Sequence, residues 1–394
     1  MDFSRVTLSP EDSEFLDQLR AFIAEHVTDE VLQRDREFGE NFDEKVHLAL
    51  GEAGYLASDW RLESEGGFSP VRRRIFDLEI GRAHAPWYHW GTTAAVARFV
   101  QQFGAPELTD MVLPGVLSGE TRLCLGYTEP EGGSDVATCK TRAVLDGDTW
   151  IINGSKMFTS NAQNAKYVFL LTNTDLQGPK HKNLTMFLVP LDSPGIEIQP
   201  LRTVDGDRTN IVYYSDVRVD DLYRIGEVNG GWTVMRSALD SEHGIFDRED
   251  DGLQHISAMS GHGSLLAEAV DKVAATLARA SLPDGRGRRP LDDESLQYRL
   301  GRDFARMEAA LSAPGMFGRV ALAQTMRDIS PDLMDMLGAA SVLPTDAPGC
   351  VDGGAVEYIF RHALPAGIYG GSLEVFRNMI AQHELKLGRA SYGA

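Results

Sequence analysis

The hydrophobic period of this chain changes twice along its length, and this pattern restricts the fold more than any other feature. Apolar residues recur at helical spacing over residues 1–120, alternate in short segments over 121–230, and return to helical spacing over 231–394. Helices and sheets bury their apolar faces in different ways and therefore form separate layers or domains. The order predicts an α+β protein in which a β domain interrupts a helical body, with ligand clefts at the junctions.

The first of these segments begins with a helix start signal. Ser9 can cap a helix, Pro10 suits the first helical position, and Asp12 stands where a capping box needs an acceptor. Residues 1–120 are therefore expected to form an N-terminal α-helical domain. Similar helical patterns follow at about 43–53, 69–83 and 92–103.

The middle segment, residues 121–230, contains short stretches rich in β-branched and aromatic residues, which predict strands. The dipeptides Asp146-Gly147 and Asn153-Gly154 are typical turn signals between such strands. Helical spacing returns from Gly231 and is broken by the stretch SLPDGRGRRPLDD. We expect a middle β domain over 121–230 and a C-terminal helical domain over 231–394.

The charge of the chain argues against two classes of partner. Lys and Arg number 38 against 58 Asp and Glu, a formal charge of −20. A chain this acidic is not expected to bind nucleic acid or anionic membrane surfaces. No stretch approaches the roughly 20 apolar residues of a membrane-spanning helix, and the first residues lack a basic region followed by an apolar run. We expect a cytoplasmic protein with no membrane partner.

The three cysteines, Cys124, Cys139 and Cys350, form neither a CxxC pair nor a Cys/His cluster. A sparse and odd number of cysteines is typical of proteins from reducing compartments rather than of disulfide frameworks. We therefore expect three buried thiols and no metal site.

Two stretches with paired glycines are candidates for ligand binding. In LGYTEPEGGSD, Gly132 and Gly133 allow close approach of the backbone to a ligand, and hydroxyls flank the turn. A polar loop that closes a hairpin is the alternative interpretation. In IYGGSLEVFRNMIAQ, Gly370 and Gly371 precede a serine that can cap a helix, so a turn with positive φ explains the pair equally well.

Three motifs together carry a more definite resemblance. TEPEGGSD, INGSKMFTSN and IYGGSLEVFRNMIA resemble signatures of the acyl-CoA dehydrogenase family, and the order of helices, β domain and helices resembles its architecture over essentially the whole chain. The resemblance implies an N-terminal helical domain, a middle β-sandwich or barrel and a C-terminal four-helix bundle. It also implies FAD as the cofactor and α,β-dehydrogenation of an acyl-CoA thioester.

The resemblance further implies which residues contact FAD. Phe158 would lie against the isoalloxazine ring and Ser160 would form a hydrogen bond with it. Ser372 and Glu374 would contact the adenosine and diphosphate region, where a helix N-terminus suits an anion; a plain first-turn acid is the alternative for Glu374. The remaining implied contacts are Leu125, Tyr127, Thr128, Gly133, Ser134, Thr159, Arg286 and Gly338.

The position of the catalytic base is unusual. Many family members have a glutamate at the position that Gly370 occupies here. A subset, including the isovaleryl-CoA and long-chain types, carries the base on the first helix after the β domain. LDSEH resembles the LDxER pattern of that subset, which implies Glu242 as the base. Gly370 would retain the backbone N–H that binds the thioester carbonyl oxygen.

The resemblance implies Ser134, Asp240, His243 and Gly371 as substrate contacts. His243 replaces an arginine common in the family, and histidine titrates near neutral pH. An RxxFG segment that reaches a neighbouring subunit's FAD in many members is replaced here by LPDGRGRRPLDD. Its arginines either serve that contact or belong to a solvated loop.

The implied partners are an acyl-CoA substrate, an electron-transfer flavoprotein and further subunits. A homo-oligomer, dimer or tetramer, and a heteromer with a second family chain, as in some bacterial dehydrogenases of sterol side-chain thioesters, both remain open. Three alternative functions also remain: an oxidase, a dehydrogenase of carrier-protein thioesters, and a non-catalytic partner subunit.

Overall fold

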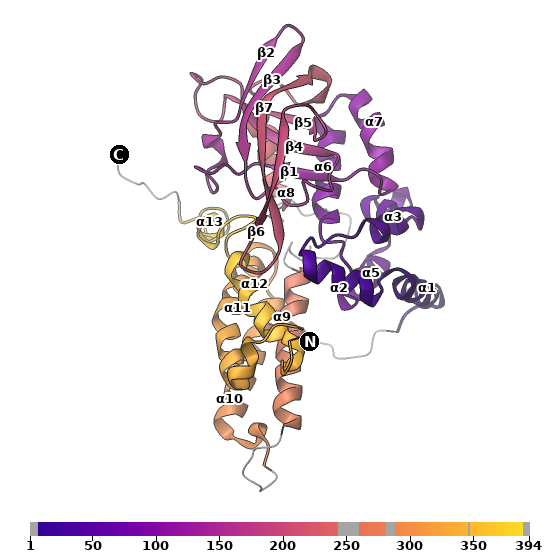
Figure 1. Cartoon of the computed structure of the whole chain (residues 1–394), viewed down its shortest axis with the longest axis vertical. Helices are drawn as coiled ribbons and strands as arrows, with labels where there is room; N and C mark the ends of the chain where they lie inside the picture. Colours follow the sequence, from indigo (N-terminus) through magenta and orange to yellow (C-terminus); the bar gives the residue numbers. More distant parts are fainter. Residues whose placement is uncertain (1–6, 243–259, 281–287, 346, 389–394) are drawn as a thin grey trace. The chain divides into compact units, whose positions relative to one another are not determined.

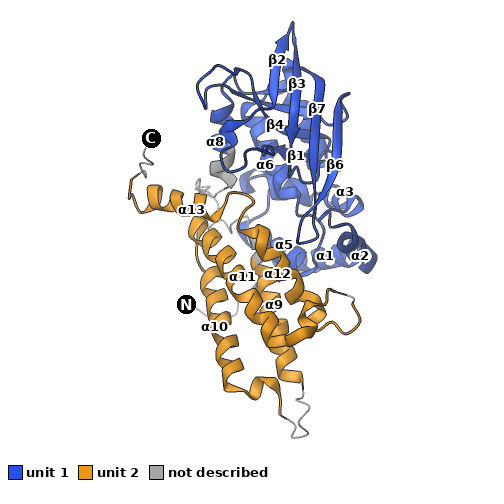
Figure 2. Ribbon diagram, turned by 60° about the vertical axis from the view of Figure 1, so that its left-hand side comes forward, with its two compact units in different colours: residues 1–239 blue, residues 240–394 orange. Residues whose placement is uncertain are grey.

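The computed structural model describes residues 7–242, 260–280, 288–345 and 347–388; the side chains of 238–242 and 260–262 lie outside this description. The chain divides into two compact units, residues 1–239 and 240–394 (Figure 2). Helix α8, Gly231–Glu242, runs across the division.

The first unit begins with helices, as the hydrophobic period predicts. Ser9 accepts a hydrogen bond from the Asp12 N–H and caps the first helix, which has Pro10 in its first turn. The predicted helices near 43–53, 69–83 and 92–103 are confirmed. In chain order the helices are α1 Pro10–His26, α2 Asp29–Phe38, α3 Glu44–Glu52, α4 Tyr55–Trp60, α5 Pro70–Arg82, α6 Trp90–Phe103 and α7 Pro106–Leu117.

The predicted strands form one connected sheet in the order β6-β7-β3-β2-β4-β5-β8, with β1 paired in parallel to β4 (Figure 1). The two-residue connection between β2 and β3 confirms the turn predicted at Asp146-Gly147. The strands are β1 Leu123–Gly126, β2 Arg142–Asp146, β3 Thr149–Lys156, β4 Tyr167–Asn173, β5 Leu184–Pro190, β6 Ile196–Arg202, β7 Arg208–Asp220 and β8 Arg224–Ile225.

The second predicted turn, at Asn153-Gly154, is wrong. Both residues lie inside β3, where the register against β7 shifts between Ile152 and Gly154. Gly154 has φ +149°, and a Cβ there would lie 2.7 Å from the Thr141 Cα. Glycine is needed at this position because a bulge brings the backbone close to its neighbour, not because the chain reverses.

Strand β4 lies at the centre of the first unit, and every one of its residues is buried. Phe169 and Leu171 face the apolar core shared with the N-terminal helices, where the Phe169 ring stacks on Phe99 of α6. Val168 and Leu170 face a second core on the other side of the sheet. This alternation follows from the two-residue period of a strand and places β1, beside β4, between two packed layers.

The second unit is helical. Helices α9 Ser260–Arg279, α10 Glu294–Leu311, α11 Gly315–Leu337 and α12 Ala355–Ala366 pack around one apolar core, and α13 Leu373–Met379 follows. Cys124 and Cys139 are buried as expected, but Cys350 in this unit is only half-buried, because it lies in an irregular segment between α11 and α12. Among the helices that the structure describes, none has the length and apolarity needed to cross a membrane.

Candidate functional site

The segment that follows β1 lies directly beside the segment that follows β3. The Met157 N–H donates to the Thr128 carbonyl at 2.9 Å, and the Lys156 ammonium lies 3.3 Å from the Tyr127 carbonyl oxygen. Gly126 ends β1 without a side chain, since a Cβ there would lie 2.9 Å from Val168 Cγ2. The predicted residues Leu125, Tyr127 and Thr128 are thus brought next to the predicted residue Phe158.

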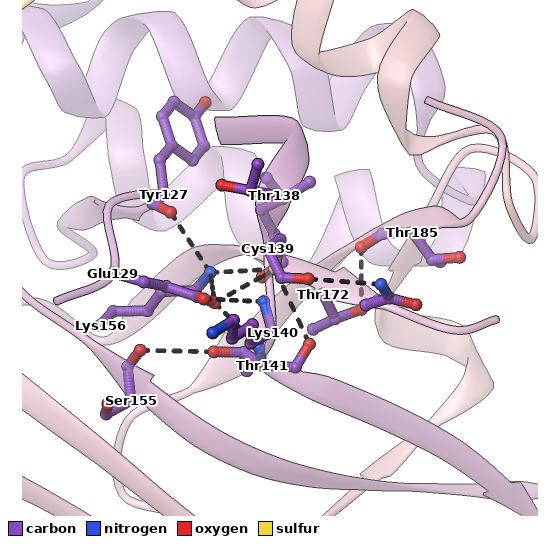
Figure 3. Close-up of polar contacts among 12 residues, drawn as sticks. Tyr127, Glu129, Thr138, Cys139, Lys140, Thr141, Ser155, Lys156, Thr172 and Thr185 are labelled. Carbon is purple, nitrogen blue, oxygen red and sulfur yellow. Dashed lines mark hydrogen bonds and ion pairs between the residues drawn. The ribbon is translucent and has the colours of Figure 1, made fainter. Parts of the chain in front are cut away.

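A buried ion pair fixes this junction (Figure 3). The Lys156 ammonium is fully buried and lies 2.7 Å from Glu129 Oε1, and the Cys139 thiol lies within hydrogen-bond distance of both groups. The Glu129 carboxylate also accepts the backbone N–H groups of Lys140 and Thr141. The pair therefore links the loop after β1, the end of β3 and the segment that leads into β2.

The electrostatics of this junction follow from burial and from the ammonium. Burial by itself raises the pKa of Glu129, but the charge of Lys156 and the hydrogen bonds from Lys156 and Thr141 lower it to about 2. Burial raises the pKa of Cys139 to about 11, with Glu129 adding to the rise. Cys139 is therefore a protonated structural thiol at neutral pH.

Phe158 presents an aromatic face to solvent directly after β3. The residue is 53% exposed and its φ is +56°, a left-handed conformation that is rare for a bulky residue. The neighbouring Thr159 is fully buried; its backbone N–H donates to the Asn210 carbonyl, but its hydroxyl has no hydrogen-bond partner within the described part of the chain. The exposed Ser160 donates its hydroxyl to Thr209.

The rest of the TEPEGGSD loop is open to solvent. The Gly132 and Glu129 backbones exchange two hydrogen bonds of 3.1 Å, which closes the turn. Gly133 lies beside the Thr128 methyl group, and both Gly133 and Ser134 are exposed. The loop thus presents a backbone edge and a hydroxyl near Thr128, whose carbonyl accepts the N–H of Met157, the residue before Phe158.

In the second unit, Gly370 and Gly371 form the turn between α12 and α13, with φ of +59° and +98°. This agrees with the positive φ expected of the pair. The Gly370 N–H donates to none of the described residues, and Gly370 is exposed. Ser372 caps α13 by accepting the Val375 N–H at 3.4 Å.

The remaining predicted residues of the second unit lie on its surface or at its helix ends. Glu374 is exposed in the first turn of α13, 3.9 Å from Arg377. Gly338 ends α11 with φ +73°. In the arginine-rich segment, Arg289 pairs with Asp292 at 2.7 Å, a local contact within one turn.

Four predicted residues fall outside what the structure describes in whole or in part. The backbone of Asp240 and Glu242 lies in the last turn of α8, but their side chains are outside the described residues. His243 and Arg286 lie outside them entirely.

Three residues that the structure singles out, a charge pair and a buried arginine, were not predicted from the sequence. Glu129 and Lys156 lie within motifs assigned to the flavin, but nothing in their spacing indicates that they pair. Arg319 is buried on α11, and its signal is visible in retrospect: it shares one helix face with the apolar residues Met316 and Ala323, three residues before and four after.

Comparison with known proteins agrees with this geometry. Residues 9–120 match the family model described as "Acyl-CoA dehydrogenase, N-terminal domain", and residues 124–221 match "Acyl-CoA dehydrogenase, middle domain". Acyl-CoA dehydrogenase FadE26 of Mycobacterium tuberculosis is 31% identical over 98% of this chain and 100% of its own length. Acyl-CoA dehydrogenase IpdE1 of the same organism is 32% identical over 96% of this chain and 99% of its own length.

Solved structures of similar proteins also support the acyl-CoA dehydrogenase family. The Tcur3481-Tcur3483 steroid ACAD superposes with a TM-score of 0.82 at 29% identity, covering 99% of this chain and 100% of that one. The ChsE4-ChsE5 complex from Mycobacterium tuberculosis superposes with a TM-score of 0.81 at 28% identity, covering 98% and 100%. With two family models, near full-length relatives and the expected sheet domain in agreement, the chain belongs to the acyl-CoA dehydrogenase family, oxidoreductases that act on CH–CH bonds of acyl-CoA thioesters.

Proposed function

We propose that this protein is an FAD-dependent enzyme that introduces an α,β double bond into an acyl-CoA thioester. The observation that carries the proposal is the half-exposed Phe158 ring, held in a left-handed conformation beside the Thr128 loop. A strained and exposed aromatic residue is costly unless a partner uses it, and a planar ring system is a suitable partner.

The chemistry of the neighbouring groups fits a flavin. The buried Thr159 hydroxyl lacks a partner among the described residues, and the exposed backbone and hydroxyls of the Thr128 and Ser134 loop offer donors and acceptors to the edge of a polar ring. Residues 125–134 and 158–160 would hold the isoalloxazine. Bound FAD would supply a two-electron acceptor for the β-hydride.

Two groups of this chain would act on the thioester itself. Glu242 would take the α-proton as a carboxylate, while the Gly370 N–H would donate a hydrogen bond to the thioester carbonyl oxygen as charge develops there. The Gly370 N–H donates to none of the described residues, so it is available to a ligand. This observation supports its proposed role as the donor to the thioester carbonyl oxygen. Glu242 would take the α-proton, and bound FAD would supply the acceptor for the two electrons and the hydrogen lost from the β-carbon, so that breaking the two C–H bonds balances formation of the C=C bond.

The proposal is tested with Glu242→Gln, which keeps the shape of the side chain and removes its basicity. The variant is expected to retain bound flavin and to lose bleaching of the flavin absorbance when acyl thioesters are added anaerobically, with a loss in rate of at least about 100-fold. Glu308→Gln on α10, an exposed glutamate, is the matched control and is expected to bleach like the unmodified enzyme. Unchanged bleaching in Glu242→Gln would reject Glu242 as the base.

An electron-transfer flavoprotein is the proposed acceptor of the electrons. An oxidase would instead form hydrogen peroxide in air without any added acceptor. Measuring peroxide during turnover of an acyl-CoA panel therefore separates a dehydrogenase from an oxidase, and replacing coenzyme A by a carrier protein tests the second thioester class.

A heteromer that acts on steroid thioesters is a second candidate. Two structures similar to this chain are described as "Tcur3481-Tcur3483 steroid ACAD" and as the ChsE4-ChsE5 complex. These two similar structures are the observation that favours pairing with a second family chain.

A further inference from the structure

Arg319 is a buried cation in the apolar core of the second unit. Only 5% of the residue is exposed, and it lies on the face of α11 that carries Met316 and Ala323. Burying a guanidinium is costly unless its N–H groups find acceptors. The hydrogen-bond acceptors of the Arg319 guanidinium therefore indicate the role of this residue.

Two of these acceptors are backbone carbonyls of one short segment. Nη1 donates to the Ala366 carbonyl at 2.7 Å, and Nη2 donates to the Tyr369 carbonyl at 2.5 Å. The guanidinium also lies over the rings of Tyr369 and Phe376, at 5.6 and 5.5 Å from their centroids. Ala366 is the last residue of α12, so the first bond caps a helix C-terminus, where a positive charge is favourable.

The second bond does more than cap a helix. The Tyr369 carbonyl and the Gly370 N–H belong to the same peptide group, and none of the described peptide bonds is cis. In a planar trans peptide the C=O and N–H point in opposite directions. A guanidinium that fixes the Tyr369 carbonyl therefore also fixes the direction of the Gly370 N–H, which points away from Arg319.

The bond also changes the strength of the donor. A hydrogen bond from a charged group is shorter and stronger than one between neutral groups. It draws electron density toward the carbonyl oxygen, and hydrogen-bonded chains polarise one another in this way, so the N–H of the same peptide becomes a better donor. Without such an anchor, the two adjacent glycines would leave the peptide free to rotate.

We propose that Arg319 is a positioning residue that orients and polarises the Gly370 N–H for the thioester carbonyl oxygen. This inference rests on the proposed function of Gly370 as that donor. If Arg319 only stabilised the fold, replacing it would change the melting temperature but would leave the electronic state of the Tyr369–Gly370 peptide unchanged once the chain is folded.

The first experiment observes that peptide directly, in the full-length protein without substrate. The chain contains two Tyr-Gly dipeptides, Tyr369-Gly370 and Tyr392-Gly393. Labelling tyrosine carbonyls with ¹³C and glycine nitrogens with ¹⁵N therefore leaves two signals in a carbonyl-edited NMR spectrum, and Gly393→Ala identifies which one to discard.

Arg319→Met and Arg319→Lys are compared with Arg306→Met. Arg306 on α10 forms an exposed ion pair with Asp328 and supplies the same chemical change away from the turn. In Arg319→Met the Tyr369 ¹³C and Gly370 ¹H signals are expected to move upfield; in Arg319→Lys, which keeps the charge, they should move less. Arg306→Met should leave both in place. Unmoved signals in a folded Arg319→Met or Arg319→Lys would overturn the inference.

The second experiment tests the consequence for the ligand. The holoenzyme is mixed with the enoyl-CoA product of its fastest acyl-CoA substrate, labelled with ¹³C at the thioester carbonyl, and the carbonyl stretch is recorded by infrared difference spectroscopy. Binding is expected to lower the frequency in the unmodified enzyme and in Arg306→Met, and to lower it less in Arg319→Lys. In steady-state assays kcat of Arg319→Lys should fall, by up to the roughly 100- to 1,000-fold loss of an oxyanion donor, with KM changed little.

The two experiments fail in different ways. In one outcome the peptide signals move in the variants, but binding leaves the carbonyl frequency unchanged in the unmodified enzyme. Arg319 then orients and polarises the Tyr369–Gly370 peptide, and the proposed role of Gly370 as the donor to the thioester is wrong. If binding lowers the frequency equally in all variants, Gly370 or another donor acts without Arg319 and the inference is wrong. Should Arg319→Met not fold, Arg319→Lys carries both measurements.

Discussion

At the scale of single residues, the first unit depends on a charge pair that water does not reach. Lys156 is fully buried, and its ammonium contacts the Glu129 carboxylate, the Cys139 thiol and the Tyr127 carbonyl. Removing one partner from such a pair leaves an uncompensated buried charge, whereas removing both is tolerated better. The pair therefore couples the stability of the sheet to the position of the loop beside Phe158.

Lys156→Met is expected to destabilise the protein by about 3–5 kcal/mol, because Glu129 would remain charged in a buried site. Lys156→Met combined with Glu129→Gln should recover a large part of this loss. The measurement is the free energy of unfolding in urea, with flavin content as a second readout.

The matched control is Lys140→Met. Lys140 pairs with Glu131, and both side chains are mostly exposed, so this change should leave the unfolding curve nearly unchanged. Equal losses from Lys156→Met and Lys140→Met would show that burial of the Glu129–Lys156 pair has no energetic effect.

At the scale of elements, local signals predicted the helices well and one turn badly. Ser9 and Pro10 start α1 because capping and a fixed φ act within one turn of the chain. Asn153-Gly154 was predicted as a turn, but it is a bulge within β3, because the approach of Thr141 from another segment selects the glycine. A dipeptide permits both outcomes, and only its neighbours in space decide between them.

Helix α3 carries a histidine that makes the first unit sensitive to acid. His47 is 2% exposed, its ring lies against Phe42 and Trp90, and neither ring nitrogen has a hydrogen-bond partner among the described residues. Burial, with a smaller contribution from Arg122, lowers the pKa of His47 from 6.5 to about 4. His47 therefore binds a proton less readily in the folded state than in the unfolded chain.

We expect the free energy of unfolding to fall as the pH falls from about 6.5 to about 4, by up to about 3 kcal/mol from this residue, and to lose nothing further from it at lower pH. His47→Leu should remove this part of the dependence, so the variant gains stability relative to the unmodified protein as the pH falls. His383→Leu, at an exposed histidine, is the control and should keep the original slope. Parallel curves for His47→Leu and the unmodified protein would contradict the prediction.

At the scale of the whole molecule, the structural relatives share the order of helices, sheet and helices with this chain, and the family models match its first two parts, residues 9–120 and 124–221. The boundaries predicted at 120 and 230 stay a prediction, since the compact units divide near residue 240 and the family models cover residues 9–221. Assembly is a question at this scale too. In many family members an RxxFG segment reaches the FAD of a neighbouring subunit, and in this chain LPDGRGRRPLDD stands in its place.

If the chain works as part of a heteromer in which its arginine-rich segment would not complete a neighbour's cofactor site, expression on its own should give less than one bound flavin per subunit. Flavin absorbance per subunit and native mass check this. Co-expression with a second family chain should raise the flavin content of the assembly. A stable homo-oligomer with one flavin per subunit would rule the heteromer out.

The sequence by itself indicated the family, the order of the layers and several helix starts, because periodicity, caps and signature motifs act over short distances along the chain. It also indicated the residues around Thr128 and Phe158 as candidate contacts of the proposed flavin. Only the tertiary structure decided that Glu129 and Lys156 share a buried site, that Asn153-Gly154 is a bulge, and that Arg319 holds the Gly370 peptide. Each of these joins residues at least 10 positions apart, and such contacts depend on how whole elements pack.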